Sequence, residues 1–368
     1  TDFSYYTNME KINNLFTEFV NHLKNNGSEN YQKYFCRPDD RFEFEIEAFK
    51  DFIKKHEVFP DEFELIPKKK NIAKLKYKYR DSSGEAEERS DNSTWVPMKK
   101  DGESWKISNK GEYLKCLAES KKWRKIKTEN IIFYFDSFLK KTLDQMNAES
   151  GSSELINIKK YLDIEEELNI SYIVYDDEKS LHELGFKSNL AGHEWIISNY
   201  PCDVFQLISL CIRRLNPELP KYFLYGFSTY YAYYISNSSF PLFNFPKEDF
   251  NRLALNSIKY GYYIKIIKLL NNTEFQKWTE MVSIMSILSQ QAAHPNLMVF
   301  LITASFFKFL FESETVGESP DIRKKRIIEI LKTGKENDFE DTFKKLTGLK
   351  IKKAEKLWKK DLKIKSRI

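Results

Sequence analysis

Two short stretches of the sequence place a histidine directly before a glutamate: His182 and Glu183 in LHELGF, and His193 and Glu194 in GHEWII. Such a pair opens the helical zinc-binding motif H-E-x-x-H, in which two histidines four residues apart bind one zinc ion and the glutamate polarises the bound water. In the first stretch the residue four positions on is a phenylalanine, and in the second it is an isoleucine. Neither stretch therefore forms a zinc site by itself.

The other histidines and the cysteines are scattered singly. They are His22, His56, His294, Cys36, Cys116, Cys202 and Cys211. No C-x-x-C pair is present, so the pattern favours neither a local metal site nor a redox site, and it neither predicts nor excludes a disulfide. For His182 the sequence predicts a solvated loop or a helix end, because Gly185 suits a helix C-cap.

Length and charge limit the possible classes of protein. The 368 residues indicate two or three domains. With 59 basic and 54 acidic residues the net charge is only +5, so we expect no nucleic-acid partner. No run reaches the roughly 18 apolar residues of a transmembrane helix. Because numbering begins at Thr1, we expect an envelope or secreted protein whose leader was removed, or otherwise a cytoplasmic one.

Periodicity in the first 120 residues predicts helices followed by a sheet. Apolar residues at helical spacing mark helices at 9–23 and 44–54. The alternating segment 72–80 predicts a strand with one buried face, and Asp101-Gly102 predicts a tight hairpin turn. The lysines of 72–80, with Lys68 to Lys70, form either a basic face for an anionic partner or, as we expect, a solvated outer face. The late D-G-x-x-W-K-I hairpin resembles SnoaL-like and cystatin-type cone folds, in which a curved sheet wraps a helix.

A second pattern begins near residue 128. We expect strands at 131–136, 170–177 and 195–201, and helices at 137–146 and 202–215. The predicted class is therefore α+β, with a small mixed sheet first and a mainly helical C-terminal part after it.

The order of motifs after residue 128 resembles the gluzincin type of metallopeptidase. The segment 220–230, PKYFLYGFSTY, is similar to the P-x-W-L-x-E-G-x-A-x-Y turn of that family, with Tyr225 where the family has a zinc-binding glutamate. Segments 304–313 and 339–362 are similar to its two closing helical segments. The resemblance implies a SnoaL-like or cystatin-type domain at 1–122 and a gluzincin-like domain at 123–368, with a helical subdomain at 250–368.

The resemblance also implies that the zinc site is degenerate. If the helix after Pro201 is the zinc helix, Phe205 and Ser209 replace its histidines and Gln206 replaces its general base. A register three residues earlier aligns Cys202, Asp203 and Gln206 instead. Neither register leaves three good zinc ligands, because phenylalanine cannot coordinate zinc and serine, glutamine and neutral tyrosine coordinate it poorly. We therefore expect no metal, no cofactor and no catalytic residues.

Three functions remain open. The first is a non-catalytic zincin-like protein whose cleft binds a peptide, glycan or protein partner. The residues expected to line that cleft are Tyr222, Tyr225, Tyr230, Tyr233, His193 and Glu194, although helical spacing also suits these tyrosines to a buried core. The second is a hydrolase with an unusual site formed by Cys202, Asp203, His193 and Glu194, which predicts a bound metal or a strongly perturbed pKa nearby. The third is a structural or assembly protein, which predicts large exposed apolar patches.

The basic C-terminal segment, 349–368, could bind nucleic acid or an acidic membrane. Lysines on an amphipathic helix more commonly form a solvated face, which is what we expect here.

Overall fold

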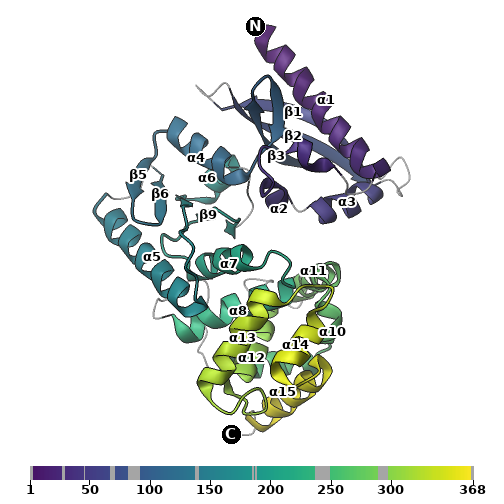
Figure 1. Ribbon diagram of the computed structural model, residues 1–368, viewed down its shortest axis with the longest axis vertical. Coiled ribbons are helices and arrows are strands. Elements are labelled where there is room, and N and C mark those ends of the chain that lie inside the picture. The colour runs from purple at the N-terminus through teal and green to yellow at the C-terminus, as the bar shows by residue number, and fades with distance from the viewer. Residues whose placement is uncertain are drawn as a thin grey trace. The chain divides into compact units, whose positions relative to one another are not determined.

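The structure, a computed structural model, describes residues 3–26, 30–44, 46–66, 71–81, 92–136, 141–184, 186, 189–236, 249–288 and 297–365. Contacts divide the chain into two compact units. Unit 1 consists of Thr1–Ala148 and Glu167–Pro201, and unit 2 consists of Glu149–Glu166 and Cys202–Ile368. Helices and sheets both occur (Figure 1), so the expected mixture of helix and sheet is confirmed.

Unit 1 begins with helices and a four-stranded antiparallel sheet in the order β1-β2-β3-β4. Its elements are α1 (Phe3–Asn26), η1 (Tyr31–Tyr34), α2 (Asp40–Phe44), α3 (Ile46–Lys55), β1 (His56–Leu65), β2 (Ile72–Asp81), β3 (Asn92–Asp101) and β4 (Ser104–Ile107). The sheet is curled into a half-barrel. The expected hairpin at Asp101-Gly102 is present between β3 and β4, where Gly102 adopts a φ of 61° that an L side chain rarely adopts.

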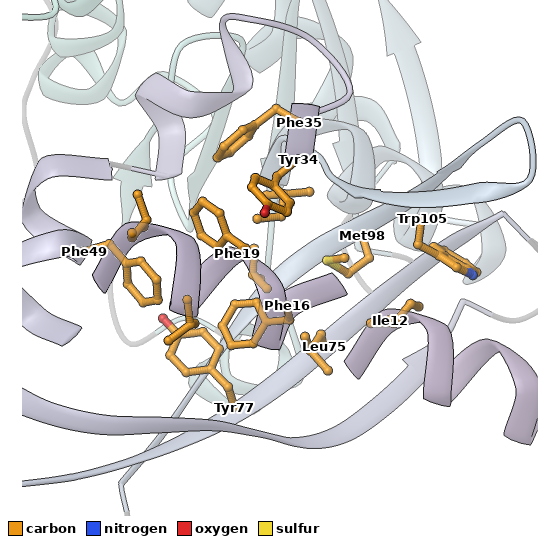
Figure 2. Packing of buried hydrophobic residues seen from close by; sticks show 14 of the residues in the cluster. Ile12, Phe16, Phe19, Tyr34, Phe35, Phe49, Leu75, Tyr77, Met98 and Trp105 are labelled. Carbon is orange, nitrogen blue, oxygen red and sulfur yellow. The ribbon is translucent and has the colours of Figure 1, made fainter. Parts of the chain in front are cut away.

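Aromatic rings fill the space between α1 and this sheet (Figure 2). Phe16 and Phe19 of α1 are fully buried, and the ring centroid of Phe16 lies 5.0 Å from that of Tyr77 in β2. Trp105 of β4 is also buried, and its indole N–H donates to Asn8 Oδ1 at 3.3 Å. These rings bury large apolar areas, so they provide much of the stability of this half of the unit.

The other face of β2 carries the lysines noted in the sequence. They pair across the strands with acidic residues of β1, at Lys74–Glu64, Lys76–Glu62 and Lys78–Asp61. The face is therefore neutralised by cross-strand ion pairs rather than positively charged. Lys68 to Lys70 lie outside the described residues.

The second sheet of unit 1 is five-stranded, in the order β5-β6-β7-β9-β8. Its elements and the helices that accompany it are α4 (Lys110–Ser120), β5 (Arg124–Lys127), β6 (Ile131–Phe135), α5 (Lys141–Leu162), β7 (Ile170–Val174), α6 (Glu178–Glu183), β8 (Leu190–Ala191) and β9 (Trp195–Ser198). β6, β7 and β9 are parallel, whereas β5 and β8 are antiparallel edges. The three parallel strands consist mostly of buried apolar residues, as expected for strands covered on both faces.

Unit 2 contains the end of α5 and the remaining helices. They are α7 (Val204–Leu215), α8 (Lys221–Tyr230), the π-helical turn η2 (Tyr231–Ile235), α9 (Asp249–Lys259), α10 (Ile266–Leu269), α11 (Asn272–Leu288), α12 (Leu297–Glu312), α13 (Pro320–Thr333), α14 (Phe339–Thr347) and α15 (Ile351–Lys365). α7 begins where the sequence predicts, because Asp203 caps it by accepting a hydrogen bond from the backbone N–H of Gln206.

Helices α8 and α12 pack closely at Gly226. A Cβ atom added there would lie 2.8 Å from ring carbons of Phe307. Glycine is therefore required by close helix packing, although it is a poor helix former.

Two predicted helices have different limits in the structure. The segment 44–54 belongs to two helices, α2 and α3. The helix expected at 137–146 continues to Leu162, and residues 137–140 lie outside the described residues. The sequence analysis also missed β1, because Pro60 and its acidic residues do not suggest a strand. Proline is tolerated there since β1 is an edge strand and its register shifts between Pro60 and Glu62.

Candidate functional site

The residues at the expected zinc-ligand positions come together on α7 and α8. The rings of Phe205 and Tyr225 are stacked, with centroids 6.1 Å apart and planes 4° from parallel. One turn further along α7, Ser209 Oγ donates to Ser228 Oγ of α8 at 2.9 Å. Both serines are buried, so their hydroxyls satisfy each other inside the helix pair.

Two more rings complete an aromatic quartet, which we define as Phe205, Tyr225, Phe275 and Phe300. The centroid of Phe300 lies 5.3 Å from that of Phe205 and 5.6 Å from that of Tyr225, and Phe275 stacks on Tyr225 at 5.8 Å. The four rings come from α7, α8, α11 and α12. Three of them have no metal-binding atom, so the quartet is an apolar cluster and offers zinc no ligand set.

The alternative register gives residues with structural roles. The side chain of Asp203 is fully buried at the N-cap of α7, where its Oδ1 accepts the 3.1 Å hydrogen bond from Gln206 N. Burial raises the pKa of the Cys202 thiol to about 11. At neutral pH Cys202 is therefore a protonated thiol, which is neither a good nucleophile nor a zinc ligand.

Among the residues that the structure describes, no group of three or more His, Cys, Asp or Glu side chains could hold a metal ion. All four cysteines are free thiols.

The tyrosines expected to line a cleft are mostly buried. Tyr222 is 0% exposed, Tyr230 is 8% exposed and Tyr233 is 6% exposed, whereas Tyr225 keeps part of its surface accessible. The Tyr222 hydroxyl has no hydrogen-bond partner among the described residues. Burial raises the pKa of Tyr222 well above its ordinary value, so the phenol stays neutral. Three of the four tyrosines thus pack as core residues, and Tyr225 is the one that a partner could reach.

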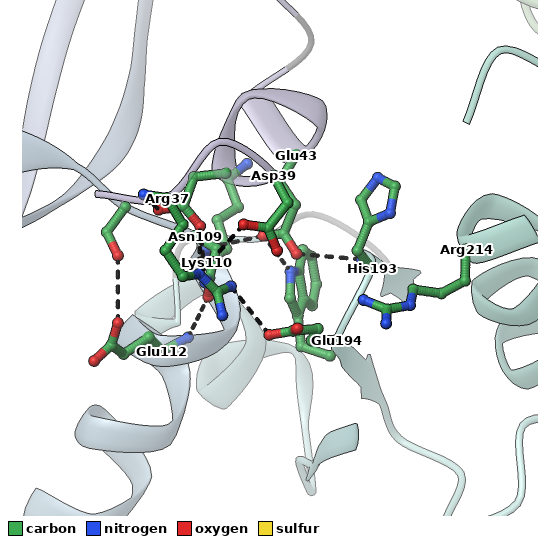
Figure 3. Close-up of polar contacts among 12 residues, drawn as sticks. Arg37, Asp39, Glu43, Asn109, Lys110, Glu112, His193, Glu194 and Arg214 are labelled. Atoms are coloured by element: carbon green, nitrogen blue, oxygen red, sulfur yellow. Dashed lines mark hydrogen bonds and ion pairs between the residues drawn. The ribbon is translucent and has the colours of Figure 1, made fainter. Parts of the chain in front are cut away.

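His193 and Glu194 belong to unit 1, whereas Cys202 and Asp203 belong to unit 2. Figure 3 shows the surroundings of the first pair. The backbone N–H of His193 donates to Glu43 Oε1 at 3.2 Å, and Arg37 Nη2 donates to Glu194 Oε2 at 3.1 Å. Glu194 is thus engaged in an ion pair with the segment before α2.

The carboxylate of Glu43 in α2 accepts hydrogen bonds from three N–H groups. We call this carboxylate and its three donors the Glu43 knot. Besides His193 N, its carboxylate accepts the indole N–H of Trp195 at 2.9 Å and the backbone N–H of Lys110 at 3.2 Å. Burial raises the pKa of Glu43 to about 7, although the three donors act in the opposite direction. The contacts join α2 to the start of α4 and to the residues around the start of β9, so the knot connects the two halves of unit 1.

Asp40, one turn before Glu43, extends this network. It is 1% exposed and accepts hydrogen bonds from Asn109 Nδ2 at 3.0 Å and from the backbone N–H of Arg37 at 3.1 Å. Asn109 in turn caps α4 by accepting from Glu112 N at 2.7 Å. Neither Asp40 nor Glu43 is expected from the sequence, because nothing in DRFEFE distinguishes a carboxylate with internal hydrogen-bond donors from a solvated one.

Two further expectations can be compared with the structure. His182 is exposed in the last turn of α6, as predicted, while Gly185 lies outside the described residues. Among the described residues, the exposed large apolar side chains are Tyr6, Phe42, Met146, Ile156, Tyr260, Ile322 and Ile364, and only Met146 and Ile156 share an element, α5. No described helix has both the length and the apolar composition needed to cross a lipid bilayer.

Comparison with known proteins identified no relative of this chain. No protein-family model matches the chain, and no curated protein matches it in sequence.

Proposed function

We propose that this protein is a non-catalytic, zincin-like protein that binds a peptide, glycan or protein partner through the surface beside the aromatic quartet. The observation that carries the proposal is the stacking of Phe205 on Tyr225. In the gluzincin-like alignment of the sequence these two residues occupy positions of zinc ligands, and an apolar ring pair there can neither hold zinc nor activate a water molecule.

The rest of the quartet supports this proposal. Phe275 and Phe300 surround the ring pair, so an aqueous metal ion at this position would be in contact with apolar carbon on several sides. Tyr225 is half-buried and combines an aromatic ring with a phenol, a combination that is enriched where proteins bind partners. The expected role of Tyr225 is therefore contact with the partner.

Restoring the zinc ligands tests the alignment on which the proposal rests. The purified wild type should contain no zinc by elemental mass spectrometry and should not cleave a mixed peptide substrate. A variant with Phe205→His, Gln206→Glu, Ser209→His and Tyr225→Glu should gain about one zinc per chain. If a folded form of this variant takes up no zinc, the alignment is wrong.

Zinc in the wild type would contradict the proposal directly. If that zinc were lost in Cys202→Ala, the register through Cys202 and Asp203 would be the working one, and the hydrolase alternative would replace the binding function.

Binding is tested at Tyr225 with a matched tyrosine as control. The wild type, Tyr225→Ala and Tyr260→Ala would be applied to one array of peptides and glycans. Tyr260 is 67% exposed on unit 2, so its loss controls for removing a surface ring. We expect ligands that the wild type retains to be lost from Tyr225→Ala and kept by Tyr260→Ala. Equal retention by all three proteins would show that binding occurs elsewhere.

The contacts described above favour neither of the other two functions. The hydrolase would need Asp203 to leave its N-cap and Glu194 to leave its ion pair with Arg37. It would also need Cys202 to lose its proton, although the pKa of that thiol is raised to about 11. An assembly protein is not favoured either, because the exposed large apolar side chains of the described residues are few and lie far apart in the sequence.

A further inference from the structure

Basic charge is concentrated at the end of the chain. Residues 344–363 contain nine lysines and only two acidic residues, in a protein whose basic and acidic residues are otherwise nearly balanced. Eight of these lysines are exposed: Lys344, Lys345, Lys350, Lys352, Lys353, Lys356, Lys360 and Lys363. The ninth, Lys359, pairs with Glu355 at 2.8 Å.

Five of the exposed lysines lie on one side of α15, and we call them the lysine face: Lys352, Lys353, Lys356, Lys360 and Lys363. At about 100° per residue, these positions fall within an arc of roughly 100° and span about 16 Å along the helix. Neither acidic residue of α15 interrupts the arc, since Glu355 is buried and Asp361 lies about 80° beyond its edge. The face is therefore uniformly positive.

Most of this charge is not neutralised within the protein. Among the described residues, Lys352, Lys353, Lys356 and Lys360 form no ion pair. This contrasts with β2, where Lys74, Lys76 and Lys78 each pair with a carboxylate of β1. Clustered lysines without ion-pair partners repel one another. Binding to an anionic surface would relieve this repulsion, so it is electrostatically favourable.

The opposite side of α15 is fixed in the core of unit 2. Ile351, Ala354, Trp358 and Leu362 are all fully buried, and the indole N–H of Trp358 donates to Ser305 Oγ at 3.2 Å. The helix therefore cannot turn its apolar side into a lipid bilayer. Any attachment through it is peripheral and electrostatic.

The chemistry of the face fits a lipid surface better than a nucleic acid. It carries no arginine, whose planar fork binds phosphates and bases in a bidentate way, and no aromatic ring on which a base could stack. Beside the arc lies Ile364, which is 53% exposed and could enter the headgroup layer. Lysines act as point charges, which suits a fluid anionic surface that has no fixed geometry.

We propose that the lysine face docks this protein onto an anionic phospholipid bilayer. Each lysine near such a surface strengthens binding about fivefold. Attraction between exposed charges is screened within a Debye length of about 10 Å at 0.1 M salt, so binding weakens steeply as ionic strength rises. This inference is independent of the partner proposed for Tyr225.

The test uses the full chain with vesicles of defined composition. Sedimentation would measure binding to vesicles rich in phosphatidylserine and to vesicles of phosphatidylcholine alone, at low and at high salt. One variant carries Lys353→Glu, Lys356→Glu and Lys360→Glu. The control carries Lys11→Glu, Lys24→Glu and Lys127→Glu, which changes the net charge equally at exposed lysines of unit 1. Circular dichroism would show that both variants are folded.

We expect binding to the anionic vesicles only, lost at high salt. The variant in the lysine face should bind at least about 100-fold more weakly, and the control variant within about tenfold of the wild type. Absence of binding to the anionic vesicles at low salt would overturn the proposal. Equal weakening by the two variants would also overturn it, since net charge alone would then be responsible. Tighter binding to a short DNA duplex than to the vesicles would make nucleic acid the partner and would contradict it as well.

Discussion

Tyrosine side chains close together on one helix differ in how deeply they are buried. Tyr222 and Tyr225 are three residues apart on α8, yet the first is fully buried and the second is partly accessible. The buried Tyr222 hydroxyl has no hydrogen-bond partner among the described residues, so it lowers stability rather than raising it. A residue type that suggests ligand contact therefore serves as packing at one position and is available for binding at the other.

Tyr222→Phe should leave the free energy of unfolding unchanged or raise it by up to about 1 kcal/mol, because the substitution removes an unpaired buried hydroxyl. Chemical denaturation measures this. The matched control is Tyr172→Phe, since the hydroxyl of the buried Tyr172 donates to the Tyr200 carbonyl at 2.6 Å. That control should lose about 1 kcal/mol. A loss at Tyr222 as large as that at Tyr172 would mean that the hydroxyl has a bonding partner in solution.

The Glu43 knot makes stability depend on pH. The folded-state pKa of about 7 lies above the ordinary value of 4.5, so this carboxyl contributes stability that is fully present below pH 4.5 and is lost as pH rises through 7. Glu43→Gln has no titrating group there, and its amide would oppose one of the three N–H donors. We expect the variant to show a smaller decline in the free energy of unfolding between pH 4.5 and 7, by roughly 1 to 3 kcal/mol.

The measurement is a series of denaturation curves across that pH range. Glu47→Gln on the exposed side of α3 is the control, and it should keep the slope of the wild type. If Glu43→Gln retained the slope as well, titration of Glu43 would not be its cause.

At the scale of the elements, the position of α7 follows from its N-cap and its buried apolar face. Its side chains offer no zinc ligand set. Asp203 starts the helix, and a stripe of buried apolar residues fixes its orientation. The Phe205 ring and the Ser209 hydroxyl contact α8 by ring stacking and by a hydrogen bond.

The role of Asp203 can be tested by comparing two substitutions. Asp203→Asn keeps an N-cap acceptor and should change the free energy of unfolding by a few tenths of a kcal/mol, whereas Asp203→Ala should lower it by about 1 to 2 kcal/mol. Thermal or urea denaturation measures both. If the Asn and Ala variants were equally destabilised, the charge of Asp203 would matter more than its hydrogen bond to Gln206.

Gly226 limits the approach of α8 to α12. Gly226→Ala should destabilise the protein by about 1 to 3 kcal/mol, although alanine is the better helix former, because the new methyl group would overlap the Phe307 ring. Adding Phe307→Leu should reduce the cost of Gly226→Ala, which a double-mutant cycle measures. Strictly additive effects would show that the methyl group does not meet that ring.

Patterns set by neighbouring residues could be predicted, and contacts between distant residues could not. The alternation in β2 and the Asp101-Gly102 turn are local signals, and both elements formed as expected. At the candidate site, the resemblance groups Phe205, Ser209 and Tyr225 as positions of one degenerate zinc site, but Phe275 and Phe300 join them from helices far along the chain. The Glu43 knot was missed for the same reason, since its donors lie 67 to 152 residues away.

On the scale of the whole molecule, the two units alternate along the sequence. Residues Glu149–Glu166, which include the second half of α5, belong to unit 2 although residues of unit 1 precede and follow them. This segment contributes the fully buried side chains of Leu155, Ile158 and Leu162. Burying each one stabilises the folded chain by about 1.5 to 3 kcal/mol.

A fragment of residues 202–368 should therefore fail to unfold cooperatively when produced alone, because it lacks those three side chains and exposes the apolar surface that they cover. Adding a peptide of residues 149–166 should restore a cooperative thermal transition. A peptide with Leu155→Ala, Ile158→Ala and Leu162→Ala is the control and should not restore it. Cooperative unfolding of the fragment without any peptide would show that 149–166 is dispensable.

The interleaving of the two units also has a consequence during synthesis. Residues 149–166 leave the ribosome before the last strands of unit 1 have been made, and the α8 and η2 residues that contact Tyr161, namely Phe227 and Tyr231, follow only after residue 202. For that interval Tyr161 lacks these native partners, and apolar surface exposed in this way makes a nascent chain prone to aggregation. We therefore expect a chaperone that binds nascent chains to contact this segment, and to release it only when synthesis is close to complete.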